Sequence, residues 1–433
     1  MLDTGNVAWM LMSTALVFFM TPGLAFFYGG MVRSKNVLNT IMHSIFMIAL
    51  ITIEWVLIGY TLVFGDDIGG IIGSLNKLGL EHVAGHIMED TGTPELLFAA
   101  FQCMFAVITP ALIAGSFAER IKFKAFVIFA LLWSIFIYNP MAHWVWGGGW
   151  LARLGALDFA GGLVIHILSG VSGLVLCILL GKRHGYGKAP MLPHHLPMVV
   201  LGASMLWFGW FGFNGGSALG ANELAVNAFM TTQVSAAAGA LAWVFTEWLL
   251  QGKPTLFGAA SGCVAGLVAI TPGAGFVGIL PSIWIGALGG AICYLAVAVL
   301  KNKLGYDDSL DAFGVHGVGG TWGAIATGIW GSVSINPAGA NGLYYGEMHM
   351  FLAQILSIVI AYALAIVGSY LLYKVISLVM DMRVDISEET AGMDIVQHGE
   401  SAYNHSIFST NALSASGTGS ELDKLVASMN HKE

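Results

Sequence analysis

Long apolar stretches recur from one end of this chain to the other, and they constrain its fold more than any other feature. A helix needs about 20 apolar residues to cross the roughly 30 Å hydrocarbon layer of a bilayer. Eleven runs approach that length, at 7–30, 39–63, 96–118, 125–142, 161–181, 197–217, 226–250, 256–272, 278–300, 311–331 and 348–380. The sequence therefore predicts an all-α integral membrane protein with eleven transmembrane helices.

The composition excludes several classes of protein. Hydrophobic residues make up 57% of the 433 positions and charged residues only 10%, whereas soluble domains carry about 25% charged residues. The net charge of −8 comes without a basic patch, which argues against nucleic-acid binding. The four cysteines lie far apart in apolar runs, which is typical of buried side chains and not of a disulfide framework or zinc site. We expect no metal, no other cofactor and no enzymatic activity, because the sequence shows neither a metal-ligand set nor a nucleophile–base pair.

The first apolar run has two interpretations, because it begins close to Met1. A signal peptide is one of them. No basic segment precedes the run, however, and Arg33 and Lys35 follow it before the next apolar run begins. We therefore interpret it as a retained transmembrane helix.

Lysine and arginine residues gather on alternate connections between the runs. They follow runs one, three, five, seven, nine and eleven, while the opposite connections hold only Lys77 and Arg153. These positive charges are Arg33, Lys35, Arg120, Lys122, Lys124, Lys182, Arg183, Lys188, Lys253, Lys301, Lys303, Lys374 and Arg383. Since positive charges favour the cytoplasmic side, the pattern predicts an outside N-terminus and an inside C-terminus in the cell (inner or plasma) membrane.

The two halves of the chain resemble each other weakly. Near the start of run five, Asp158 is followed by His166, and near the start of run ten, Asp311 is followed by His316, each beside a Gly-rich segment. Five runs separate them, so the two segments enter the membrane from opposite faces. This pattern predicts an inverted repeat of five plus five helices, about 7–181 and 197–331, with 348–380 added.

His166 and His316 are the most informative polar residues within the runs. Ionisable groups inside a membrane are expensive and usually functional, although a helix–helix hydrogen bond would also explain them. Each histidine lies near the start of its own helix. The two can meet only in an inverted fold with staggered helices.

Aromatic residues gather near the predicted outer face. Trp146 lies at the outer end of run four, Phe105 lies in run three, and Phe213 lies close to Ser217 in run six. Each could belong to an ordinary interfacial aromatic belt. Together they could also bind a small cation by cation–π attraction of about 0.5–2 kcal/mol.

Six segments carry a family resemblance. They are 26–33 (FFYGGMVR), 114–120 (AGSFAER), 145–149 (VWGGG), 158–166 (DFAGGLVIH), 209–214 (GWFGFN) and 313–317 (FGVHG). Through them the chain resembles ammonium transporters of the Amt/Mep/Rh type, in the bacterial Amt form, over nearly its whole length.

The resemblance implies roles for particular residues. Phe105, Trp146 and Ser217 are similar to the outer site that recruits ammonium, and Phe105 and Phe213 to the stacked rings that close the pore. His166 and His316 are similar to the paired histidines of the pore, and Asp158 to an aspartate of structural and electrostatic role. The resemblance also implies ammonium or ammonia as substrate, a homotrimer, and a PII-type signal protein as a possible cytoplasmic partner.

An apolar pore suits ammonium for a physical reason. Moving an ion from water into a low-dielectric interior costs on the order of 20 kcal/mol by an idealised estimate. Ammonium can release its proton and cross as neutral ammonia, which potassium cannot do. A neutral imidazole is both donor and acceptor, so the paired histidines can pass a proton. We therefore expect recruitment as the cation, deprotonation near the phenylalanine pair, and conduction past the histidines.

The chain becomes polar after the last run, which divides it into a transporter domain, 1–380, and a tail, 381–433. Composition alone indicates disorder for the tail, whereas the resemblance implies a cytoplasmic regulatory segment. Residues 404–433 are rich in Ser, Asn and Thr, and we expect that part to be disordered.

Some questions stay open at this level. An ammonium sensor with little transport, or a neutral-gas channel of the Rh kind, would share most of these features. Glu54 lies in the middle of run two, where a carboxylate is unexpected. It could be protonated, or bonded at a contact between subunits.

Overall fold

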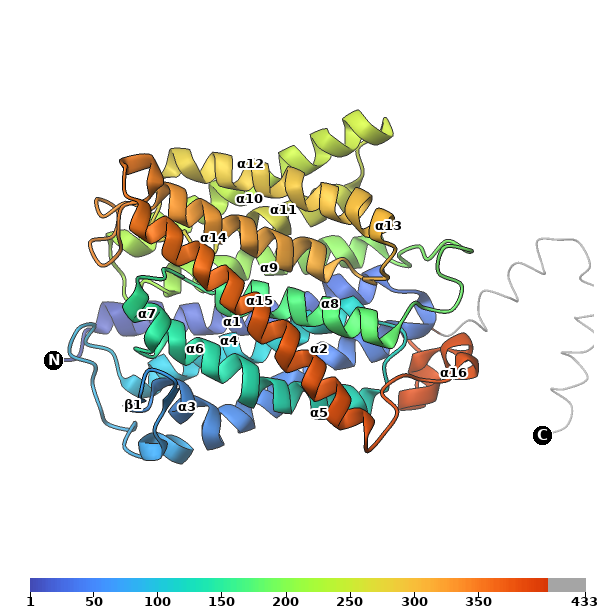
Figure 1. Cartoon of the computed structure of the whole chain (residues 1–433), viewed down its shortest axis with the longest axis horizontal. Coiled ribbons are helices and arrows are strands. Elements are labelled where there is room, and N and C mark those ends of the chain that lie inside the picture. Colours follow the sequence, from blue (N-terminus) through green and yellow to red (C-terminus); the bar gives the residue numbers. More distant parts are fainter. Residues whose placement is uncertain (404–433) are drawn as a thin grey trace, which may run out of the picture.

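The computed structural model describes residues 1–403 as helices that run side by side, most of them along the longest axis (Figure 1). The N-terminus, strand β1 (Asp67–Ile68) and α7 (Trp150–Leu154) lie at one end, here called the N-terminal end. Helices α13 (Lys301–Leu304) and α16 (Ile386–Ala391) lie at the opposite end, the tail end. The expected disorder of 404–433 concerns residues outside the described part.

Within residues 1–403, nine helical segments are long and apolar enough to cross a membrane. They are Thr4–Met31, Ser34–Phe64, Glu95–Phe117, Phe123–Leu154, Gly162–Leu180, Leu196–Gly216, Glu223–Gln251, Ile279–Leu304 and Met348–Ser377. The chain is therefore an integral membrane protein built of helices, as predicted. The two remaining predicted runs are helical but shorter, since α11 (Leu256–Ile270) has 15 residues and 311–331 contains η8 (Phe313–Gly317) followed by α14 (Val318–Trp330).

Small residues let the helices approach closely. Helix α1 (Thr4–Met31) crosses α9 (Leu196–Gly216) where a Cβ atom on Gly202 would lie 2.2 Å from the backbone nitrogen of Phe27. Such contacts are typical of membrane helices, whose association depends on packing and not on the exclusion of water.

The helices that carry the two histidines cross in the same way. His166 lies in η6 (Gly162–Ile167), which continues as α8 (Leu168–Leu180), and η8 continues as α14. A Cβ atom on Gly170 would lie 2.2 Å from the Gly317 nitrogen, and one on Gly320 would lie 2.9 Å from the His166 Cβ. Both η6 and η8 are π-helical turns, which are common at functional sites.

The structure corrects one part of the predicted repeat, because Asp308, and not Asp311, is the counterpart of Asp158. Asp308 lies eight residues before His316, as Asp158 lies eight before His166. Its carboxylate accepts hydrogen bonds from the N–H groups of Ala312 (3.2 Å) and Phe313 (2.8 Å) at the start of η8. The earlier pairing with Asp311 was wrong.

Asp311 instead corresponds to Gly161. Each lies three residues after its capping aspartate, and each has a positive φ, +61° at Asp311 and +112° at Gly161. The left-handed turn lets the chain fold back so that the preceding carboxylate reaches the free N–H groups of the helix.

Glu54 is bonded within its own chain. Its carboxylate accepts from the Ser134 hydroxyl (3.1 Å) and from the Asn139 amide (2.8 Å). Glu54 ends α2 (Val37–Glu54), just before the π-helical turn η2 (Trp55–Gly59), and Ser134 begins a second such turn, η5 (Ser134–Tyr138). The carboxylate therefore joins two membrane segments, and no second subunit is needed to satisfy it.

The tail packs against the tail end of the bundle through residue 403. Met393 N–H donates to the Asn36 side-chain oxygen (2.8 Å), and the Asn39 N–H donates to the Asp394 carboxylate (2.9 Å). Asp394 begins η10 (Asp394–His398). These contacts attach the tail to the first turn of α2.

Candidate functional site

An open pocket lies at the N-terminal end of the bundle and contains the predicted recruitment residues. Phe105 comes from α4 (Glu95–Ile113), Trp146 ends α6 (Asn139–Trp146), and Ser217 directly follows α9. The pocket has a volume of about 280 Å³. Among the described residues, its lining holds no Lys or Arg side chain. Aromatic rings and neutral polar groups therefore face anything that enters it.

Two phenylalanine rings lie between this pocket and the histidines, since Phe105 lines the pocket and Phe213 lines the cavity at the histidines. Phe105 and Phe213 stack with their centroids 4.4 Å apart and their planes 22° from parallel. Trp146 meets Phe105 edge-on at 6.2 Å, and Ser217 donates its hydroxyl to the Phe213 carbonyl (2.8 Å). The four predicted residues thus form one constellation, although they come from three helices and the residue after one of them.

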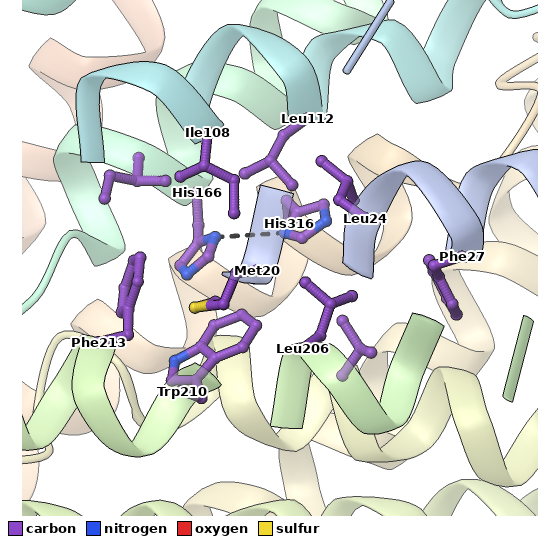
Figure 2. A pocket seen from close by; sticks show the side chains of 12 residues that line it. Met20, Leu24, Phe27, Ile108, Leu112, His166, Leu206, Trp210, Phe213 and His316 are labelled. Carbon is purple, nitrogen blue, oxygen red and sulfur yellow. Dashed lines mark hydrogen bonds between the residues drawn. The ribbon is translucent and has the colours of Figure 1, made fainter. Parts of the chain in front are cut away.

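His166 and His316 meet directly beyond the phenylalanine pair. Their Nδ1 atoms are 3.2 Å apart, and their rings are nearly parallel, with an interplanar angle of 16°. Figure 2 shows the two imidazoles between Phe213 at one end and Phe27 at the other. The staggered arrangement that the sequence required is therefore present.

The hydrogen bond between the histidines restricts their tautomers. One Nδ1 must donate and the other accept, so two neutral rings present one Nε2 acceptor and one Nε2–H donor. The Nε2 atom of His166 is buried and has no hydrogen-bond partner within residues 1–403. This nitrogen therefore has an unused hydrogen-bonding position.

The space around the histidines is narrow and apolar. It is a cavity of about 10 Å³, close to the smallest volume, roughly 10–15 Å³, that holds one water molecule. Apart from the histidines, its walls are aliphatic, aromatic and thioether side chains, among them Met20, Leu24 and Ile108 (Figure 2). The walls offer nothing to replace the water shell of an ion.

Asp158 does not face the recruitment pocket with its carboxylate. The two oxygens accept four backbone N–H bonds, from Gly161 (2.9 Å), Gly162 (2.6 Å), Leu163 (2.7 Å) and Val164 (3.1 Å). Burial raises the pKa of this carboxyl, and the four N–H groups oppose that effect because they favour the ionised form. Asp158 thus holds the start of the helix that carries His166.

Trp146 is attached to the same turn. Its indole N–H donates to the backbone carbonyl of Asp158 (2.8 Å), and the side chain lines the pocket. The base of α6 is fixed by His143, whose Nε2 lies 3.0 Å from an Asp67 carboxylate oxygen. Asp158 therefore holds both Trp146 and the start of the helix that carries His166.

Sequence reasoning missed two residues of the site. Gln102 lines the outer pocket, and it lies three residues before Phe105 on the same helix face, a spacing that could have identified it. Trp210 stacks on His166 with centroids 5.5 Å apart, and its indole N–H donates to Thr271 (2.9 Å). No sequence signal separated it from the neighbouring aromatic residues.

A second pocket, of about 270 Å³, lies at the tail end of the bundle. Unlike the first, it is lined by charged side chains, which are Arg183, Lys301 and Asp311. The Lys301 ammonium group pairs with the Asp311 carboxylate and lies 3.4 Å from the backbone carbonyl oxygen of Asp308. Within residues 1–403, no group of three His, Cys, Asp or Glu side chains is arranged to hold a metal ion.

A buried charge network supports this end. Arg183 pairs with Glu119 (3.0 Å) and Asp307 (2.7 Å), and Arg33 also pairs with Glu119 (2.8 Å). Burial alone would raise the pKa of both carboxyls, but the guanidinium groups hold both pKa values below their usual range. Each charge is therefore matched within the network.

Comparison with known proteins agrees with this arrangement. The sequence profile described as "Ammonium Transporter Family" matches residues 8–403. A protein named "Ammonium transporter" from Bacillus subtilis (strain 168) is 51% identical over 407 residues, which cover 94% of this chain and 100% of that protein.

Solved structures share the fold. The crystal structure of Saccharomyces cerevisiae Mep2 superposes with a TM-score of 0.83 at 36% identity, covering 89% of this chain and 91% of that one. A structure named "Sensor Amt Protein" superposes with a TM-score of 0.84 at 26% identity, covering 91% of this chain and 98% of the other.

Proposed function

This chain belongs to the ammonium transporter family, and we propose that it moves ammonium nitrogen across a membrane through the histidine-lined pore. The observation that carries the proposal is the alignment of three features along one path. The aromatic pocket leads to the stacked pair Phe105 and Phe213, and that pair leads to His166 and His316.

We further propose that all eleven helical segments cross the membrane, with the N-terminus outside and the tail in the cytoplasm. The N-terminus and α16 lie at opposite ends of the bundle, which an odd number of crossings requires (Figure 1). Positive charges concentrate at the tail end, which favours that end as the cytoplasmic one. The membrane would then be the cell membrane, and the domain 1–380 would carry the regulatory tail beneath it.

Ammonium is recruited as the cation. Trp146 and Phe105 line the pocket, where a small cation would bind over a ring face, and Ser217 offers a hydroxyl oxygen. A cation over an aromatic face gains about 0.5–2 kcal/mol, and more where water is displaced. The pocket therefore concentrates ammonium above the phenylalanine pair.

The phenylalanine pair and the narrow lumen then select against ions. A charged particle must lose its water to pass the stacked rings, and no wall group replaces that water. Ammonium passes by giving its proton, just beyond Phe105 and Phe213, to the unprotonated Nε2 of the histidine pair, so that neutral ammonia enters the lumen. His166 and His316 bond ammonia in transit and pass the proton between their nitrogens, because each ring can exchange donor and acceptor roles.

A sensing role is the second candidate, because the solved "Sensor Amt Protein" shares the fold. A neutral-gas channel of the Rh kind is disfavoured by the aromatic pocket, which suits a cation. Three copies of the chain would form the working assembly, and the packed tail offers a surface for a PII-type partner. These assignments rest on the family.

Purified protein in liposomes tests the proposal. An ammonium jump should evoke a current or an internal pH change, while a potassium jump should evoke neither. Replacing both His166 and His316 by alanine should abolish the discrimination against potassium or stop the flux. Unchanged selectivity in that double variant would refute the histidine mechanism, and a wild-type protein with no ammonium response would favour the sensor.

A further inference from the structure

The two mouths of the pore are related by the repeat but differ in chemistry. At the N-terminal end, the backbone carbonyl of Asp158 accepts the indole N–H of Trp146 (2.8 Å). At the tail end, the carbonyl of the corresponding residue, Asp308, lies 3.4 Å from the ammonium nitrogen of Lys301. Both donors come from the membrane segment that precedes the capping aspartate. Lys301 therefore contacts the carbonyl that corresponds to the one Trp146 bonds, although the two residues do not occupy corresponding sequence positions.

Size does not explain why one mouth would recruit ammonium and the other would not. The pockets have nearly the same volume, about 280 Å³ at the outer mouth and about 270 Å³ at the tail end. The outer pocket is lined by aromatic rings with Gln102 and Ser217, whereas the inner pocket is lined by Arg183, Lys301 and Asp311. The difference between the mouths is one of charge and hydrogen bonding.

The Lys301 side chain ends in a primary ammonium group, which is the closest covalent analogue of the substrate. It pairs with the Asp311 carboxylate, whose side chain is only 15% exposed, and its own side chain is 18% exposed. A free ammonium ion in the inner pocket would seek the same partners, a carboxylate and a backbone carbonyl. Those partners are already bonded to a cation that the chain itself supplies.

We propose that Lys301 occupies the inner counterpart of the recruitment site and so keeps cytoplasmic ammonium from binding there. This inference rests on the proposed transport function and assigns the protein a residue that sets the sidedness of substrate binding. Lys301 cannot change the final equilibrium, because a passive pore only follows the gradient. It sets how much ammonium the tail face needs to half-saturate transport, and it limits inhibition by the product.

A purely structural role makes a different prediction. If the Lys301–Asp311 ion pair only stabilised the fold, its loss would affect flux from both faces alike. The proposed role changes only the concentration dependence measured from the tail face. Transport from the two faces must therefore be measured separately.

The experiment uses full-length protein in liposomes that are sorted by whether a C-terminal tag is accessible outside. Ammonium-evoked currents and internal pH changes are recorded for wild type, Lys301→Met, Lys301→Arg and Lys303→Met. The methionine removes the charge and keeps the length of the side chain, and arginine keeps the charge. Lys303 is exposed on the same short helix, so its replacement is the matched control for loss of a nearby charge.

In wild type we expect half-saturation from the tail face to need about tenfold more ammonium than from the outer face. Lys301→Met should lower the tail-face value about tenfold, since ammonium then gains a charge-assisted hydrogen bond to Asp311. Lys301→Arg and Lys303→Met should behave as wild type. Equal half-saturation from both faces of wild type, or an unchanged tail-face value in a transporting Lys301→Met protein, would overturn the inference while leaving transport intact.

Two further outcomes also decide the question. If Lys301→Met does not fold, product inhibition in wild type and in Lys301→Arg provides the test. Ammonium added at the tail face should inhibit transport from the outer face only weakly in both proteins. Strong product inhibition would overturn the inference. No response from either face of wild type would refute the transport function and this inference together.

Discussion

Replacing Asp158 by asparagine tests how the histidine helix is held in place. The carboxylate accepts four backbone N–H bonds at 2.6–3.1 Å, two on each oxygen. An asparagine keeps one oxygen with its two bonds. Its NH₂ group replaces the second oxygen and faces two N–H donors that it cannot satisfy.

The structure also gives the expected loss of stability in Asp158→Asn, and Asp308→Asn is its control. A hydrogen bond to a charged group contributes roughly 1.5–3 kcal/mol, so the loss of two corresponds to about 3–6 kcal/mol. Within residues 1–403, Asp308 accepts two backbone N–H bonds, one on each oxygen. Asp308→Asn therefore loses one bond, or about 1.5–3 kcal/mol, while it changes the same chemical group at the matching place in the other half.

Unfolding in detergent, followed by tryptophan fluorescence, measures both losses. The assay should run at about pH 8, because burial and the neighbouring Asp311 raise the pKa of Asp308 to about 6, and the carboxyl must be ionised. Asp158→Asn should cost about twice as much as Asp308→Asn, and its ammonium flux should fall because His166 loses its anchor. Equal losses in the two variants, or full stability of Asp158→Asn, would refute the reasoning.

Three other outcomes follow from the structure. Burial opposes ionisation of Glu119 and Asp307, but Arg183 and its neighbours hold both pKa values below the unfolded values of about 4.3 and 3.9. The contribution of these two carboxylates to stability is therefore complete above about pH 4–5 and is lost in more acidic solution. A melting temperature that stays constant from about pH 7 to about pH 3 would contradict this. Asp394→Ala should make 381–403 more sensitive to limited proteolysis, since it removes an acceptor at the start of α2; an unchanged digestion rate would argue against that attachment. Trp146→Leu should raise half-saturating ammonium from the outer face by about 2- to 30-fold, the equivalent of about 0.5–2 kcal/mol of cation–π attraction, and flux measurements at several concentrations would show whether it does.

Hydropathy predicted the helices well because the bilayer imposes one length on every crossing. The errors lie at the ends, as in run four, predicted at 125–142 and found within Phe123–Leu154. That segment continues past the apolar core because π-helical turn η5, helix α6 and the short helix α7 follow one another. Tryptophans and glycines in this part lower its hydropathy, and residues 147–149 separate α6 from α7.

The position of Glu54 shows a different limit. Its neighbours in the chain are mostly apolar, and the nearby polar side chains, Thr52 and Trp55, bond other groups. The groups that bond it, Ser134 and Asn139, lie 80 and 85 residues away. Such a contact depends on how segments pack, and packing in a membrane leaves little trace in the pattern of a single helix.

The sequence pattern pairs Asp158 with the wrong aspartate, Asp311, for a physical reason. Asp311 begins the apolar run, and hydropathy therefore favours it. The true counterpart of Asp158 is the aspartate whose carboxylate can reach the free N–H groups of the first helical turn. Asp308 meets that requirement, and Asp311 takes the left-handed turn that glycine takes in the other half. A constant separation of 150 residues then relates the capping aspartates, the turns and the histidines.

Aligning Asp308 with Asp158 changes the role that we infer for Lys301. With Asp311 as the capping residue, Lys301 would be one more interfacial lysine in a surface ion pair. With Asp308 in that role, its ammonium group lies against the inner counterpart of the carbonyl that Trp146 bonds at the outer mouth. The two corresponding carbonyls thus contact different groups, which are the Trp146 indole at one end and the Lys301 ammonium group at the other. For a substrate that is itself a small cation, that difference acts directly on binding, and it is the reason to measure the two faces separately.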